Sequence, residues 1–117
     1  MTFLIQQGPL ALFAAFLVVH ALADYPLQGD YLARNKVRAH TKDKGEWLIA
    51  LLAHSTIHAG GVWLVSGSLA LGATEWILHA LIDLGKGEGK FGLVTDQVLH
   101  LICKLGYVTV LYLGLVG

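Results

Sequence analysis

Long apolar stretches alternate along the chain with short polar segments, and this alternation predicts its helices. No Asp, Glu, Lys or Arg occurs in residues 2–23 or in residues 47–74. A helix of about 20 apolar residues crosses the hydrocarbon core of a bilayer, so the second stretch is too long for one span. The letters SGSLALG at 66–72 divide it. We therefore predict an all-α, four-helix transmembrane bundle with helices at about 4–24, 47–65, 69–85 and 91–115.

The polar segments predict the topology of the chain. Residues 28–46 form a basic loop with five of the eight Lys and Arg residues, and Lys86 and Lys90 lie between the third and fourth helices. The positive-inside rule places both segments in the cytoplasm, with both termini on the other side of a bacterial inner membrane. Residues 29–40 fit a short interfacial helix, and His40 is expected to be solvated. We predict one integral membrane domain over 1–117, built from two helical hairpins.

Composition agrees with this interpretation. The chain is 56% hydrophobic and 14% charged, and its mean hydropathy is +0.64. A formal net charge of zero gives no electrostatic support for nucleic-acid binding. The expected partner is the lipid bilayer. Because four short helices leave much of their perimeter uncovered, the pattern also leaves a homodimer open.

Each predicted helix carries one pair of ionisable residues spaced i, i+4. This spacing brings both side chains of a pair to one helix face. Ionisable groups in a membrane normally face the interior of a bundle. The pairs are His20/Asp24, His54/His58, His79/Asp83 and Asp96/His100. HALAD at 20–24 and HALID at 79–83 are nearly the same letters, so the two hairpins resemble repeats related by an axis along the membrane normal.

The numbering also predicts which residues lie at equal depth. In an antiparallel pair of helices, residues at one level have numbers with a constant sum. One sum relates the first two helices and has its midpoint in the basic loop, and a second sum relates the last two and has its midpoint between Lys86 and Lys90. Together they place all eight side chains near the cytoplasmic ends of the helices. The predicted levels are Asp24 with His54, His20 with His58, Asp83 with Asp96, His79 with His100, and Glu75 with Lys104. The last of these predicts a buried ion pair, either structural or catalytic.

Imidazole and carboxylate groups at this spacing are divalent-metal ligands. Zinc is favoured, and iron or manganese remain open. Five histidines and three aspartates exceed one tetrahedral ion, so we predict two ions, or one ion whose ligands are held by the remaining groups. His79, Asp83, His100 and His20 are the ligands we expect first. For any one residue alone, a hydrogen bond between helices is the competing interpretation.

The same segments suggest catalytic and binding roles. Asp24, Asp83 and Asp96 are the candidate general bases. Lys36 and Lys86 are candidates for holding an anionic head group. Cys103 follows His100 by one turn, and we expect a packed thiol there.

The segments HALADYPLQGDYLARNK, LLAHSTIH, HALIDLGK and FGLVTDQVLHL carry a resemblance. Together they resemble an uncharacterised family of small bacterial and phage membrane proteins, catalogued as a domain of unknown function. Its pattern is HxxxDFxLQ followed by K, a His in the second helix, HxxIDxxK and DQxxH, with Tyr25 here in place of Phe. The resemblance implies that Gln28, Lys36, Lys86 and Gln97 join the motif set, and it implies no activity. HxxxD motifs are also loosely similar to inner-membrane metal-dependent hydrolases.

Three functions remain open at this point. The first is a metal-dependent hydrolase that cleaves an ester, amide or phosphoester of a lipid-like substrate near the cytoplasmic interface. The second is a metal carrier, which the clustering of the pairs near one face disfavours. The third is a non-catalytic membrane module, in which the polar pairs lock helices together or recruit a partner.

Overall fold

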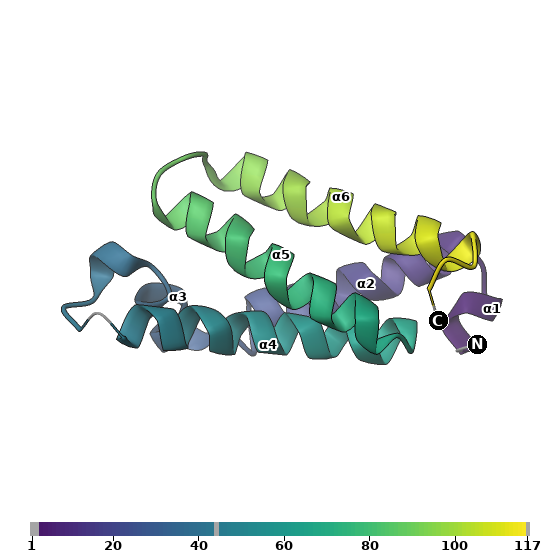
Figure 1. The fold of residues 1–117 in the computed structure, drawn as a ribbon, viewed down its shortest axis with the longest axis horizontal. Helices are drawn as coiled ribbons and strands as arrows, with labels where there is room; N and C mark the ends of the chain where they lie inside the picture. Colours follow the sequence, from purple (N-terminus) through teal and green to yellow (C-terminus); the bar gives the residue numbers. More distant parts are fainter. Residues whose placement is uncertain (1–2, 44, 117) are drawn as a thin grey trace.

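Figure 1 shows the computed structural model, which describes residues 3–43 and 45–116 and contains no strand within them. The all-α prediction is confirmed for this part of the chain. Lys44 of the basic loop lies outside the described residues. Three short helices accompany four long ones: α1 (Phe3–Gln6), α3 (Gly29–Asn35) and the 3₁₀ helix η1 (Arg38–His40). The long helices are α2 (Pro9–Asp24), α4 (Glu46–Ser66), α5 (Leu69–Gly87) and α6 (Leu93–Tyr112).

The single helix predicted for 4–24 is wrong, because the chain breaks between α1 and α2. Gly8 has a φ of 105°, a conformation that favours glycine. Pro9 then occupies the first position of α2, where its missing N–H costs nothing. At the other end, Pro26 disfavours a helical conformation at Tyr25, where α2 stops. The α3 axis turns by 87° from α2, and the helix predicted within 29–40 is found at Gly29–Asn35.

The remaining helix ends follow ordinary capping chemistry. Gly67 ends α4 in the left-handed conformation, at φ 72°. Ser68 caps α5, because its hydroxyl oxygen accepts a hydrogen bond from the Leu71 N–H at 3.2 Å. The α5 helix runs two residues beyond the predicted end at 85. The α6 helix stops at Tyr112, short of the predicted 115.

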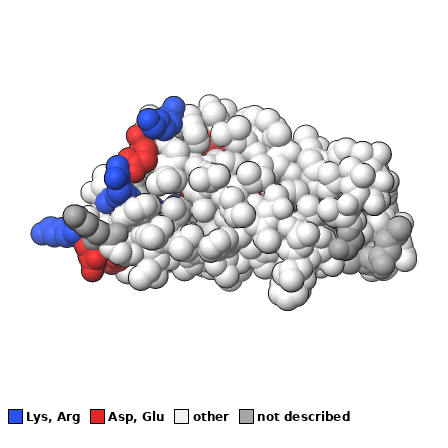
Figure 2. All heavy atoms as spheres, viewed as in Figure 1, with Lys and Arg blue, Asp and Glu red and all other residues white. Residues whose placement is uncertain are grey.

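The long helices alternate in direction, and the two ends of the bundle differ (Figure 1). We call the end with α3, η1 and the α5–α6 turn the polar end. The end with α1, the α4–α5 turn and residues 113–116 is the terminal end. Figure 2 shows that the Lys, Arg, Asp and Glu side chains visible on this face gather at the polar end. Most of the remaining described surface on that face is white.

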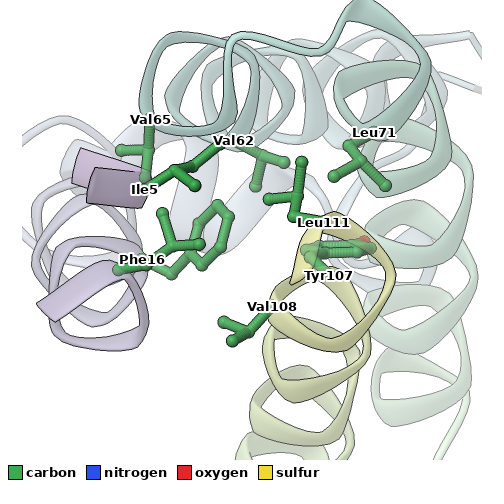
Figure 3. Packing of buried hydrophobic residues seen from close by; sticks show 9 residues of the cluster. Ile5, Phe16, Val62, Val65, Leu71, Tyr107, Val108 and Leu111 are labelled. Carbon is green, nitrogen blue, oxygen red and sulfur yellow. The ribbon is translucent and has the colours of Figure 1, made fainter. Parts of the chain in front are cut away.

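An apolar cluster fills the bundle toward the terminal end (Figure 3). Phe16 and Tyr107 meet edge to face there, with ring centroids 5.9 Å apart. The Tyr112 hydroxyl donates a hydrogen bond to the Ile5 carbonyl and so ties α6 to α1. The buried members of the cluster are Ile5, Leu12, Phe16, Val62, Val65, Leu71, Tyr107, Val108 and Leu111.

Two helices, α4 and α6, are long and apolar enough to cross a membrane, by length and composition. The α2–α3 pair adds a third span if the bent pair is counted as one. The α5 helix contains Glu75, Asp83 and Lys86 and does not meet the criterion. Four membrane spans are therefore not shown, although four long helices are present.

Candidate metal centre

The four i, i+4 pairs converge inside the bundle, between the apolar cluster and the polar end. Each long helix contributes one pair, and all eight side chains are buried or nearly so. The imidazole rings pack closely, with centroids 3.7 Å apart for His58 and His79 and 4.3 Å apart for His79 and His100. The eight residues that the spacing singled out thus lie together. Whether they bind metal stays a prediction.

The Asp24 carboxylate is one focus of the centre. His58 Nε2 lies 2.8 Å from Asp24 Oδ1, and His54 Nε2 lies 3.3 Å from the same oxygen. His20 Nε2 lies 3.1 Å from Oδ2. Three imidazoles from two helices therefore share one carboxylate.

The Asp83 carboxylate is the other focus. His79 Nε2 and His54 Nε2 lie 3.3 Å and 3.4 Å from Asp83 Oδ2, and His100 Nε2 lies 3.2 Å from Oδ1. His54 therefore lies between the two carboxylates. All five histidines present Nε2 to Asp24 or Asp83.

Several of these contacts have the spacing of neighbouring metal ligands without the geometry of hydrogen bonds. His54 Nε2, His79 Nε2 and Asp96 Oδ1 are buried and have no hydrogen-bond partner. Adjacent ligands of a tetrahedral ion lie about 3.3 Å apart when the metal–ligand bonds are about 2.0 Å. Buried polar atoms without partners are costly, and a shared cation would satisfy them together. The donor set therefore fits a metal ion.

Three compact groups have ligand atoms that all lie within 4.8 Å of one another. The group around Asp24 and the group around Asp83 share no residue, so each could hold one ion. The Nε2 atoms of His58 and His100 hydrogen-bond to carboxylates here, so a bound ion would displace the proton from each Nε2. The groups are Asp24/His54/His58/His79, Asp83/Asp96/His100 and Glu75/His79/His100.

His20 belongs to none of these groups, although it was among the ligands expected first. Its Nε2 lies 3.2 Å from the Gln97 Oε1, which can only accept a hydrogen bond. The Gln97 amide nitrogen in turn donates to Asp96 Oδ2 at 3.0 Å. His20 and Gln97 therefore connect Asp24 to Asp96 at the side of the centre.

Glu75 lies one turn deeper and is already engaged, so the third group is the weakest. Lys104 Nζ donates to its Oε1 at 2.6 Å, and the Tyr107 hydroxyl donates to Oε2 at 2.6 Å. Glu75 and Lys104 are each 1% exposed, and the predicted ion pair is confirmed. Sequence reasoning missed Tyr107, although it follows Lys104 by three residues on the same helix face.

Glu75 also orients His79. Its Oε1 accepts a hydrogen bond from His79 Nδ1 at 3.1 Å. This bond fixes the proton on Nδ1 and leaves the lone pair of Nε2 directed toward the centre. Carboxylates hydrogen-bonded to metal-binding histidines act in this way, and they raise the basicity of the ligand.

The residues implied by the family resemblance lie at the margin of the centre. Lys36 Nζ donates to Asp83 Oδ2 at 3.1 Å, and the Gln28 amide donates to the Asp24 carbonyl at 2.8 Å. Lys86 forms no salt bridge with the eight residues but lines the same cavity as the three aspartates. That cavity has a volume of about 120 Å³.

Two further residues lie away from the centre. His40 is exposed in η1, and its Nδ1 lies 3.0 Å from the Arg34 carbonyl oxygen. Cys103 is half-buried and packs against the apolar cluster. Both agree with what the sequence indicated.

Most of the chain matches a known protein family. Residues 12–114 match the family described as Protein of unknown function (DUF3307). No curated protein and no solved structure matches the chain.

Proposed function

The chain belongs to the DUF3307 family of proteins of unknown function, and we propose that it is a membrane-embedded, metal-dependent hydrolase. One observation carries the proposal. The Nε2 atoms of five histidines lie 2.8–3.4 Å from two carboxylates, one buried and one nearly so, beside a cavity. Packing alone does not require this arrangement, which suits divalent cations and a small reacting group.

Two ions fit the donor set best. Asp24, His54 and His58 would hold one, with His79 completing the group, and Asp83, Asp96 and His100 would hold the other. Zinc suits these nitrogen and oxygen ligands, and iron or manganese are the alternatives. When bound, the ions would polarise the substrate and make a water more acidic. Lys36 would hold Asp83 in place, and Glu75 would hold His79.

Asp96 is the strongest of the three candidate general bases. The carboxylates of Asp24 and Asp83 are each shared among three imidazoles, whereas Asp96 Oδ1 has no hydrogen-bond partner. Asp96 also lines the cavity. It is therefore suited to accept a proton from water and return it to the leaving group.

The distribution of polar and apolar groups supports a membrane location. Buried positions include ionisable side chains from every long helix, while large apolar residues such as Leu10, Ile49 and Leu64 are exposed. The longest dimension is 47 Å, compared with about 40–45 Å for a bilayer with its head groups. Glu75 and Asp83 face inward, so α5 can meet lipid despite its charges. The basic polar end would then face the cytoplasm.

The depth of the centre favours a hydrolase over a metal carrier. Below it, Glu75, Lys104 and Tyr107 bond to one another, and the apolar cluster fills the bundle beyond them. No further set of three or more metal-ligating groups follows within the described residues. A carrier needs ligands along its path, so the terminal end does not suit it.

Metal analysis combined with a substrate panel tests the function. The full chain, purified in detergent, should retain one or two divalent ions and should cleave one class among carboxylic esters, amides and phosphoesters. Asp96→Asn should lower turnover by about 100-fold or more and weaken binding of the second ion, with the first ion retained, while Asp43→Asn in the exposed loop should change neither turnover nor metal content. A metal-loaded protein that cleaves none of the three classes would contradict the hydrolase and favour the non-catalytic membrane module.

Labelling tests the location separately. Single cysteines at Lys42 and Lys90, in a Cys103→Ala background, should both react with an impermeant reagent only from the cytoplasmic side. Labelling of the two positions from opposite sides would contradict the arrangement of two hairpins.

A further inference from the structure

The aspartates of the centre open onto a cavity of about 120 Å³ at the polar end, between the end of α2 and the start of α6. At about 30 Å³ per water, this volume holds roughly four waters, which suits a small polyatomic group. A second cavity, of about 270 Å³, extends below α3 and η1. Both cavities are bordered by Lys36, Asp83 and Lys86.

The two lysines differ in their partners. Lys36 Nζ is 3.1 Å from Asp83 Oδ2, so its charge is partly used by the centre. Lys86 is exposed and forms no salt bridge within residues 3–43 and 45–116. Its ammonium group is therefore free to meet a ligand.

The charge of the cavity depends on metal. Its lining has the carboxylates of Asp24, Asp83 and Asp96 and the ammonium groups of Lys36 and Lys86, which leaves one negative charge in excess. One divalent ion leaves one positive charge in excess, and two ions leave three. The cavity therefore repels anions without metal and attracts them with metal.

Part of the rim of the cavity is apolar. Tyr25 and Leu93 line it and are 74% and 61% exposed, and their neighbours Leu27 and Val94 are exposed as well. A group that enters from this side passes an apolar surface before it reaches the lysines. This combination suits an amphiphile with an anionic head.

We propose that the centre binds and hydrolyses a phosphate monoester, with the phosphate between Lys36, Lys86 and the metal ions. The proposal rests on the metal-dependent hydrolysis proposed above and names its substrate class. A terminal phosphate has three non-bridging oxygens and two negative charges, which match these cations, and lysine is a common phosphate ligand. The apolar rim indicates that the alcohol part is a lipid.

The reaction balances without a further reactant. The oxygen of a water forms a bond to phosphorus while the ester P–O bond breaks. Asp96 accepts the proton of the water, and the leaving oxygen ends with a proton. The products are an alcohol and inorganic phosphate.

Phosphate release from two substrates tests the proposal. The full chain, with its metal content measured, is assayed on phosphatidylcholine vesicles that contain phosphatidic acid and on glycerol 3-phosphate in solution. We expect metal-dependent release from phosphatidic acid and much slower release from glycerol 3-phosphate. Lys86→Met should raise KM about 10- to 100-fold with unchanged metal content. Lys90→Met, which removes a charge outside both cavities, should leave KM unchanged.

The outcomes separate the two proposals. Metal-loaded protein that releases no phosphate from either substrate but cleaves the acyl esters of the vesicles overturns the phosphate proposal and keeps the hydrolase. Equal rates on the two substrates overturn the lipid part, and an unchanged KM in Lys86→Met overturns the assigned phosphate site. Protein that retains no metal overturns both proposals.

Discussion

The same four long helices build two interiors of opposite character. Toward the polar end they enclose imidazoles and carboxylates, and toward the terminal end they enclose the apolar cluster. Leu12 and Phe16 of the cluster are completely buried among side chains that need no further partner. His54 and His79 are equally buried, yet each has an Nε2 without a hydrogen bond. Packing alone completes the apolar cluster, whereas the centre keeps polar atoms without a hydrogen-bond partner, which the proposed ions would satisfy.

The largest expected effect is the loss of metal on removing a ligand. In His79→Ala, the affinity for metal should fall by more than the roughly 100-fold seen when outer residues of metal sites are changed. The rise in unfolding temperature on adding metal should disappear with it. Elemental analysis and thermal unfolding in detergent measure both, with His40→Ala as the control. Full metal content in the His79→Ala variant would show that His79 is not a metal ligand, and the contrast between the two interiors would then be wrong.

The second effect comes from the network that joins the interiors. Glu75→Gln leaves Lys104 buried without its partner, which should cost roughly 3–5 kcal/mol of unfolding free energy. Because glutamine orients His79 less firmly than the Glu75 carboxylate does, metal affinity should also fall about 10- to 100-fold.

Adding Lys104→Met to Glu75→Gln separates these two roles. The double variant should recover most of the stability but not the metal affinity. If both recover together, Glu75 does not orient His79.

A smaller effect is expected in the apolar cluster. Leu12→Ala leaves a cavity and should cost about 2 kcal/mol, the low end for such changes, because the unfolded chain remains in detergent. Metal stoichiometry should stay unchanged. Leu10→Ala, at a neighbouring exposed position, is the matched control. Loss of metal in Leu12→Ala would show that the two interiors are not independent.

The smallest effect concerns a surface contact at the polar end. Arg38 Nε lies 2.8 Å from Glu88 Oε1, but the arginine side chain is exposed. Glu88→Gln should change the unfolding free energy by no more than about 1 kcal/mol, and high salt should remove the difference. A larger loss at high salt would mean that this pair belongs with the buried interactions of the centre.

Sequence reasoning succeeded where polar residues marked the inner face of a helix. The i, i+4 spacing and the antiparallel numbering predicted that His79 would meet His100 and that Glu75 would meet Lys104, and both pairs are close. The resemblance pointed to Gln97 and Lys36, which contact Asp96 and Asp83.

The apolar half was less predictable for a physical reason. In a helix that is apolar all round, hydrophobicity does not distinguish the inner face from the outer one. Leu12 is fully buried and Leu10 is 81% exposed, although both are leucines of one helix. The break at Gly8 and Pro9 was missed because the prediction followed the absence of charged residues, which continues through QQGP at 6–9. A criterion based on composition excludes α5 as a membrane span because it contains charged residues such as Glu75 and Asp83. It takes no account of the fact that these two side chains face inward.

The arrangement in hairpins has a consequence for the timing of assembly. The α2–α4 hairpin leaves the ribosome first and brings three histidines of the centre but only one of its carboxylates, Asp24. Asp83 and Asp96 arrive with α5 and α6, a few seconds later at about 5–20 residues per second. The first-made half alone therefore lacks the charge to hold two cations. If the proposed ions bind, full loading with metal must follow completion of translation, when the second half has joined the first.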